Sequence, residues 1–153
     1  MTELTAPGDQ VVNPGESVVF TQVPVPCNRG FVRHRLGSGN VLLAGKVFRK
    51  PCGCFPNNAQ YALKFGANIG VPTGGTAEAI TIAIAIDGST IPSSQMEVTP
   101  AAVEQFFNVN RDIVAEVWSG CCETITIRNT SSQPITVRNP SLDISRPDLA
   151  MSR

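Results

Sequence analysis

The hydrophobic pattern of this chain is dominated by a strict two-residue alternation over residues 78–87. Isoleucine occupies every second position from Ile80 to Ile86, which is the period of a β-strand that turns one face to a core. The positions between them are small residues: Ala79, Thr81, Ala83 and Ala85. Because a solvent-facing surface is usually more polar, we expect this second face to be covered too, by a packed neighbouring layer or by another subunit.

The same alternation recurs along the chain and predicts an all-β protein. Turn sequences such as Asn13-Pro-Gly, Asp87-Gly and Asn139-Pro separate the alternating segments. Strands are expected at residues 17–23, 30–36, 40–48, 60–69, 77–87, 113–118, 124–129, 135–138 and 141–145, with an edge piece at 95–98. One or two helical turns are expected from Thr99, where Thr99 would cap and Pro100 would begin the helix. Eight to ten short strands with abundant Gly and Pro favour an antiparallel β-sandwich of the jelly-roll type.

The length of the chain predicts one domain. A chain of 153 residues can bury a full hydrophobic core and leaves little room for a second one. We expect this domain to span residues 17–146, which hold all the predicted strands. Residues 1–16, rich in turn formers and acids, are expected to form an extended N-terminal arm that reaches a partner, and residues 147–153 a C-terminal tail.

Charge is balanced over the whole chain but unevenly placed along it. Twelve basic and twelve acidic side chains cancel, which argues against general affinity for nucleic acid or membranes. Residues 17–77 nevertheless carry seven bases and no acid, whereas residues 1–16 carry three acids and no base. Such asymmetry can pair segments within a monomer or steer copies together, and a solvated basic face is the alternative. The basic strand 29–36 could contact nucleic acid, but without a wider surplus of charge we do not expect that partner.

The five cysteines are expected to remain mostly free. No apolar run approaches the roughly 20 residues that span a bilayer, and the N-terminus lacks the pattern of a signal peptide, so we expect synthesis and maturation in a cytosol. An odd number of cysteines cannot all pair within one chain. A disulfide joining the region of Cys52 and Cys54 to Cys121 and Cys122, within or across subunits, is one alternative. A zinc site completed by Cys27 or His34 is another, but the spacing suits it poorly, so we expect no metal and no cofactor.

The residues that usually carry catalysis do not form a recognisable group. His34 is the only histidine, and alternation places it on the same strand face as Val32 and opposite Arg33 and Arg35. No acid lies near it in sequence to orient it as a general base, and the carboxylates elsewhere are scattered singly. We therefore expect His34 to be a partly buried or interface residue, and the protein to have no catalytic residues and not to be an enzyme.

A series of short motifs in the second half of the chain carries a family resemblance. In order, they are Val71-Pro-Thr-Gly-Gly-Thr, Ile84-Ala-Ile-Asp-Gly, Ile91-Pro-Ser-Ser-Gln-Met, Thr99-Pro-Ala-Ala-Val, Phe107-Asn-Val, Cys122-Glu-Thr-Ile-Thr-Ile-Arg-Asn-Thr-Ser and Ile135-Thr-Val-Arg-Asn-Pro-Ser-Leu-Asp-Ile. Over residues 60–146 this series resembles small C1q/TNF-like jelly-roll modules, which include structural proteins of bacteriophages and prophages. The chain lacks the Gly-X-Y stalk of the collagen-linked relatives.

The resemblance implies a homotrimer with a non-enzymatic role. The implied protein is a capsid decoration or head-fibre protein, made in a host bacterial cytoplasm and carried on the virion surface, whose partners are itself and other virion proteins. Residues 1–16 would then reach a neighbouring subunit or the capsid. In a trimer one ring of Phe106-Phe107 could lie at the shared axis, because consecutive strand residues point to opposite faces; ordinary core packing is the alternative. The candidate subunit-interface residues are Ala79, Thr81, Ala83, Ala85, Phe106 and Phe107.

A receptor- or glycan-binding fibre tip is the alternative function within the same family. Such a tip predicts exposed aromatic and polar groups in the loops Pro51–Asn58 and Pro72–Gly75, gathered at one end of the sandwich.

Overall fold

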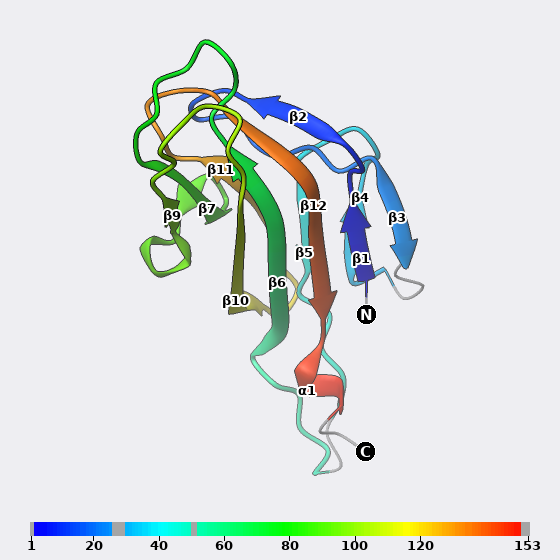
Figure 1. Cartoon of the computed structure of the whole chain (residues 1–153). Helices are drawn as coiled ribbons and strands as arrows, with labels where there is room; N and C mark the ends of the chain where they lie inside the picture. The colour runs from blue at the N-terminus through cyan, green and yellow to red at the C-terminus, as the bar shows by residue number, and fades with distance from the viewer. Residues whose placement is uncertain (1, 26–29, 50–51, 151–153) are drawn as a thin grey trace.

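The computed structural model describes residues 2–25, 30–49 and 52–150 as two antiparallel β-sheets packed face to face (Figure 1). Sheet A has the strand order β10-β6-β12-β1-β3, and β2 also pairs with β12. Its strands are β1 (Thr2–Thr5), β2 (Asp9–Val12), β3 (Gln22–Val25), β6 (Asn58–Gly70), β10 (Phe107–Trp118) and β12 (Ile135–Ser145). Sheet B has the order β4-β5-β11-β7-β8, and β9 also pairs with β7. Its strands are β4 (Val32–His34), β5 (Val41–Ala44), β7 (Ile80–Ile86), β8 (Ser89–Thr90), β9 (Met96–Val98) and β11 (Cys122–Asn129).

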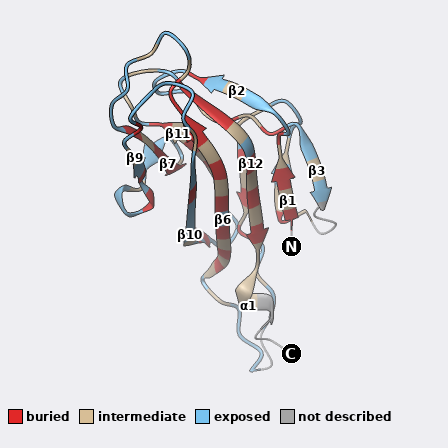
Figure 2. Ribbon diagram, in the orientation of Figure 1, coloured by how far each residue is buried: buried red, intermediate tan, exposed pale blue. Residues whose placement is uncertain are grey.

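The core lies between the two sheets and follows the alternation seen in the sequence. Along β6 the buried residues are Ala59, Tyr61, Leu63, Phe65, Ala67 and Ile69, and Figure 2 shows buried and partly buried positions alternating along this strand. Sheet B contributes five fully buried isoleucines to the same core: Ile80, Ile82, Ile84, Ile125 and Ile127. The antiparallel β-sandwich expected from the periodicity is therefore confirmed.

The second face of β7 is covered by the chain itself. Ala83 and Ala85 are 2% and 0% exposed. Arg128 of β11 stands directly opposite Ala83, and its Nη1 donates a hydrogen bond of 2.7 Å to the carbonyl oxygen of Gly88. The Arg128 side chain therefore runs along β7 past Ala85. This second face is therefore covered within the chain at Ala83 and Ala85, and the role of these two residues at a subunit contact stays a prediction.

The N-terminal segment is part of sheet A rather than a free arm. β1 pairs with β12 and places Leu4 opposite Leu142, and β2 pairs with the other half of the same strand edge. Leu4 and Val12 are 0% and 2% exposed. The extended arm expected over residues 1–16 is corrected accordingly: these residues form two strands of sheet A, and Leu4 and Val12 belong to the core.

A bulge in β12 allows β1 and β2 to pair with the same side of that strand. The sequence predicts two strands here, whereas β12 is one strand with a register shift between Arg138 and Ser141. Asn139 takes a φ of 49°, and its Oδ1 accepts a 2.8 Å hydrogen bond from the amide of Gly8. Its own amide donates to the Gly8 carbonyl at 3.0 Å. The chain thus passes from β1 to β2 around Asn139.

The tight turn after β7 matches the Asp-Gly sequence signal. Asp87 and Gly88 have φ values of 50° and 87°, and Ile86 pairs with Ser89 across the turn. Two consecutive residues with positive φ form the type I′ hairpin that Asp-Gly favours. Twelve strands are present in the described ranges instead of eight to ten, because β1, β2 and the two-residue β8 are added.

The helix expected after Thr99 does not form. Residues 101–104 are bends and turns, the residues on either side of them are irregular, and Glu104 has a φ of 59°, which is incompatible with a right-handed helix. The Glu104 amide donates to the Val71 carbonyl at 2.7 Å, and its side chain accepts a 2.9 Å hydrogen bond from the Thr73 amide. The short helices are elsewhere, at η1 (Pro92–Ser94) and α1 (Pro147–Ala150). Within the described ranges, no helix has the length and apolar character needed to cross a membrane.

Candidate functional site

The outward face of sheet A is built largely from small and polar side chains. Across it, Gly66 lies between Asn110 of β10 and Ser141 of β12, and Ala62 lies between Val114 and Ser145. Glycine, alanine and serine leave room for another surface to approach the backbone closely. One row farther along, Lys64 stands opposite Asp112 on one side and Asp143 on the other, and the Asp143 Oδ1 is buried without a hydrogen-bond partner.

Exposed hydrophobic side chains are concentrated on the strands of sheet A. Among the described residues, the large hydrophobic residues that are exposed within strands are Val11, Phe107, Val114 and Trp118, at 58%, 37%, 62% and 64%. All four belong to sheet A, whereas Leu36, Phe48, Phe55 and Val103 are in loops. Val11, Val114 and Trp118 point away from the core. β10 is also an edge strand of twelve residues, so sheet A presents these three exposed apolar side chains on a largely polar face, together with an open edge.

The predicted interface residues do not gather into one surface. Ala79 is exposed just before β7, and Thr81 is half-buried, its hydroxyl 2.6 Å from that of Thr130. Thr81 belongs to β7 of sheet B, whereas Phe107 begins β10 of sheet A and Phe106 directly precedes it. The role of these four residues at a subunit contact stays a prediction.

Phe106 is held within the chain by a charged neighbour. The Arg138 guanidinium carbon lies 3.9 Å from the centre of the Phe106 ring, and Arg138 also forms a 2.7 Å ion pair with Asp9. The hydrogen bond from Arg138 lowers the pKa of Asp9 below its ordinary value. This cluster fastens β2 to β12 and leaves Phe107 as the more exposed of the two rings.

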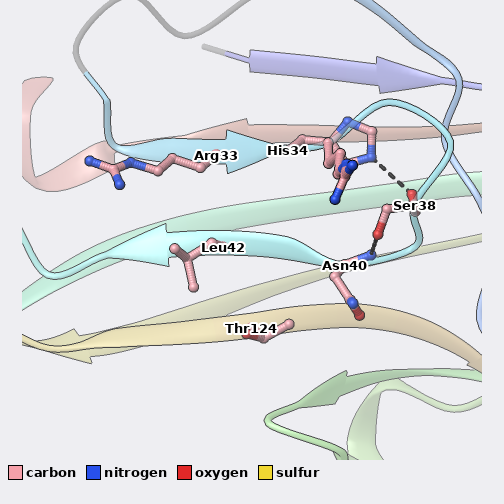
Figure 3. Close-up of a pocket in the computed structure, with 7 residues that line it drawn as sticks. Arg33, His34, Ser38, Asn40, Leu42 and Thr124 are labelled. Atoms are coloured by element: carbon pink, nitrogen blue, oxygen red, sulfur yellow. Dashed lines mark hydrogen bonds between the residues drawn. The ribbon is translucent and has the colours of Figure 1, made fainter.

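A polar groove crosses the outward face of sheet B (Figure 3). One depression of about 560 Å³ is lined by Arg33, His34, Arg35, Ser38, Asn40, Leu42 and Thr124. A second, of about 390 Å³, is lined by Ser17, Asn40, Asp87, Gly88, Thr124, Thr126 and Arg128. The two adjoin, because Asn40 and Thr124 line both. We call this pair of depressions the sheet B groove.

His34 sits at one wall of this groove, next to the turn that follows β4. Its Nε2 lies 2.9 Å from the Ser38 carbonyl oxygen, as the dashed line in Figure 3 marks, and its ring meets that of Phe20 edge-on at 6.2 Å. The register of β4 places His34 with Val41 and Arg33 with Leu42 on the other face, as the alternation predicts. The Nδ1 atom is buried without a partner, and no carboxylate lines this half of the groove.

Glu123, at the start of β11, is a carboxylate held in an unfavourable place. Its Oε2 is buried without a hydrogen-bond partner, and burial, together with the negative charge of Asp87, raises the pKa of Glu123 above its ordinary value. A carboxyl group whose pKa is raised on folding destabilises the fold when ionised. This destabilisation is fully present above the raised pKa of Glu123 in the folded state, and it disappears below the pKa of the same group in the unfolded chain.

We expect Glu123→Gln to raise the melting temperature at pH 7 and to leave it unchanged near pH 3. At neutral pH the glutamine amide removes the buried charge of Glu123 and its repulsion with Asp87. In acid Glu123 is protonated, so glutamate and glutamine at this position are both uncharged. Differential scanning calorimetry of the variant at both pH values measures this. Glu97→Gln, on an exposed position of β9, is the control and should change neither value. An equal gain at both pH values would contradict the electrostatic cause.

The described cysteines are partly bonded. Cys52 and Cys54 form a disulfide with each other, and Cys121 and Cys122 are exposed free thiols. The expectation of free thiols therefore holds for the second pair and is wrong for the first. The bridge also lies within one region instead of joining the two. Cys27 lies outside the described residues, and no cluster of three or more metal-ligating side chains occurs in the described part of the chain.

The two loops expected at a binding tip lie at opposite ends of the sandwich. The loop Pro51–Asn58 leads into β6, and the loop Pro72–Gly75 follows it. The two ends of this thirteen-residue strand are about 40 Å apart. Phe55, in the first loop, is 60% exposed with the Arg49 guanidinium 5.6 Å from its ring centre. The expected clustering at one end is therefore wrong.

The comparisons with known proteins identify the fold. No family model and no curated protein matches the sequence. The globular domain of zebrafish complement 1qA protein is similar in structure, with a TM-score of 0.53 and 10% identity over 91% of this chain and 93% of that domain. Pika GITRL gives a TM-score of 0.41 at 13% identity, covering 92% of this chain and 96% of GITRL. The PRD1 vertex protein P5 gives 0.43 at 11% identity, covering 92% of this chain and 93% of P5. Because the last two scores are below 0.5, the fold rests on the first comparison: this chain has the jelly-roll fold of a C1q/TNF-like module.

Proposed function

We propose that this protein is a non-enzymatic structural protein of a phage virion, a capsid decoration or head-fibre component that assembles as a homotrimer through sheet A. The C1q/TNF-like fold and the resemblance of residues 60–146 to phage jelly-roll modules support this role. The observation that carries the proposal is that Val11, Val114 and Trp118 are exposed on the outward face of sheet A. Sheet B strands expose no comparable side chain among the described residues.

A second copy of the chain is the occupant that fits this face. Ala62, Gly66 and Ser141 allow close approach, Val114 and Trp118 supply apolar area, and β10 leaves one edge unpaired. Three copies related by a threefold axis would form a closed ring by repeating one heterologous contact.

Light scattering of the purified chain tests the assembly. We expect a mass of about 49 kDa for three chains of 16.2 kDa, and about 16 kDa for Val114→Lys, because the ammonium would be desolvated at the contact. Leu36→Lys is the matched control, since Leu36 is also 62% exposed but lies in the turn after β4. A monomeric unmodified chain, or a trimer that survives Val114→Lys, would contradict assembly through this face.

The virion role needs a separate measurement. Particles produced by the virus or prophage that encodes the chain are purified on a density gradient and their proteins quantified by mass spectrometry. We expect this chain in the particle fraction at many copies per genome. Its absence from intact particles would overturn the structural role while leaving the trimer untouched.

A receptor- or glycan-binding module is the second candidate, and the sheet B groove is the observation that favours it. The groove is on the sheet opposite to the proposed subunit contact, so trimer assembly would leave it open.

A further inference from the structure

The sheet B groove has the size of a ligand site and lies across strands that hold its shape. Its two depressions, of about 560 and 390 Å³, fall in the range of small-molecule sites. β4, β5 and β11 form its floor side by side, with Arg33 facing Leu42 and Thr124 facing Leu42 from the other side. Figure 3 shows these side chains on the three neighbouring strands, with Asn40 beside the turn after β4. The floor is therefore a rigid sheet rather than a loop.

The half of the groove next to β4 is basic. Arg33 and Arg35 line it, and none of the residues that line this half is acidic. Neither arginine forms an ion pair with any described residue. The chain holds no acidic residue from position 17 to position 77, so nothing in the neighbouring sequence neutralises them. An arginine guanidinium is suited to bind carboxylate or phosphate oxygens through paired hydrogen bonds.

The other half of the groove offers neutral hydrogen-bonding groups, one fixed carboxylate and Arg128, whose Nη1 is bonded to the Gly88 carbonyl oxygen. Thr124 and Thr126 of β11 and Ser17 contribute hydroxyls, and Asn40 contributes an amide. Asp87 is held by the backbone, because its Oδ1 accepts a 2.8 Å hydrogen bond from the Thr124 amide. Hydroxyls, an amide and a carboxylate together can donate to and accept from the hydroxyl groups of a sugar.

The composition of the lining disfavours nucleic acid. Single-stranded nucleic acid is bound by aromatic side chains on which the bases stack. No Phe, Tyr or Trp lines either depression. The aromatic residues exposed in the described loops, Phe48 and Phe55, are not among the lining residues.

We propose that the sheet B groove binds an acidic saccharide. The carboxylate or phosphate of the sugar faces Arg33 and Arg35, and its hydroxyls face Asn40, Thr124 and Asp87. This inference rests on the second candidate function, the glycan-binding role, and is independent of the trimer through sheet A.

Isothermal titration calorimetry with defined probes tests the inference. The probes are trigalacturonate for a carboxylate sugar, mannose 6-phosphate for a phosphate sugar, maltotriose for an uncharged sugar, and the oligonucleotide dT10. We expect at least one acidic sugar to bind, maltotriose to bind at least tenfold more weakly, and dT10 not to bind. The two acidic probes distinguish which anionic group the groove prefers.

Two variants in the groove and one control variant outside it assign the binding to the groove. Arg35→Gln should weaken acidic-sugar binding at least tenfold. Arg111→Gln, an exposed arginine on β10 of sheet A, removes the same charge and should leave binding unchanged. Thr126→Val should weaken the binding of the acidic sugar more than it weakens the binding of inorganic phosphate.

Each remaining outcome overturns the inference. No binding of either acidic sugar, equal affinity for dT10, or equal losses in Arg35→Gln and Arg111→Gln would contradict an acidic-saccharide site in this groove. Light scattering of the same samples reports the oligomer separately. A trimer without sugar binding would reject only this inference, and sugar binding by a monomer would reject only the assembly through sheet A.

Discussion

Replacing Tyr61 with alanine is expected to lower the free energy of unfolding by about 4 kcal/mol, the usual cost of removing a large aromatic side chain from a core. Tyr61 is fully buried in β6 of sheet A. Its hydroxyl lies 3.0 Å from the carbonyl oxygen of Phe31 and also contacts that of Ala44, at the end of β5 in sheet B. The ring therefore fills the core while its hydroxyl bonds across to the other sheet.

Tyr61→Phe separates these two contributions. The phenylalanine ring keeps the packing and loses only the hydrogen bond, so we expect a loss of about 1 kcal/mol. Urea denaturation followed by circular dichroism measures both variants, at one protein concentration because dissociation of an oligomer would add a concentration-dependent part. Equal losses in Tyr61→Ala and Tyr61→Phe would show that the ring contributes little and would contradict the packing argument.

Tyr61 also anchors the C-terminal end of the described chain. The Arg146 guanidinium carbon lies 4.8 Å from the ring centre of Phe31 and 5.0 Å from that of Tyr61, and it forms a 2.7 Å ion pair with Asp148. Burial raises the pKa of Asp148, but the hydrogen bond and charge of Arg146 outweigh it, so the pKa is lowered overall. Residues 147–153 are expected as a tail, yet Asp148 also accepts a 3.4 Å hydrogen bond from the Gln60 amide.

Much of the architecture could be predicted because β-strand periodicity is a local property. The buried isoleucines Ile80, Ile82 and Ile84 of β7 and the Asp87-Gly88 turn each depend on neighbouring residues alone, and both are found as expected. The helix after Thr99 was expected from local capping signals but is overridden by a distant contact, the hydrogen bond from Glu104 to Val71. The N-terminal strands were missed because Leu4 and Val12 give too few alternating positions to distinguish a strand from an arm.

The surfaces were harder to predict because they depend on which strands become neighbours. The alanines of β7 are hidden by Arg128, forty-five positions away from Ala83 in sequence. The sheet B groove joins Arg33, Asn40 and Thr124, which meet only after β4, β5 and β11 have paired. The acid-free basic segment 17–77 was a signal for the groove, but it could not indicate the hydroxyl groups that complete it.

Asn129 is a core residue that could not be predicted, because nothing in its sequence position indicates that this asparagine is buried. It is 1% exposed. Its Nδ2 donates to the carbonyl oxygens of Val12 and Gln133, both at 2.9 Å, and its Oδ1 accepts a 2.8 Å hydrogen bond from the Ser131 amide. One side chain thus joins β2 of sheet A to the turn between β11 and β12.

We expect Asn129→Ala to lower the free energy of unfolding by about 3 kcal/mol, because one buried carbonyl, one partly buried carbonyl and one amide lose their partner. Urea denaturation measures the loss under the conditions used for Tyr61. Asn13→Ala is the matched control: its exposed side chain makes one 3.3 Å hydrogen bond to Glu16, and we expect a change within about 0.5 kcal/mol. Similar small losses in both variants would mean that water replaces the Asn129 amide, and that the backbone pairing of β2 with β12 holds the N-terminal segment in sheet A without it.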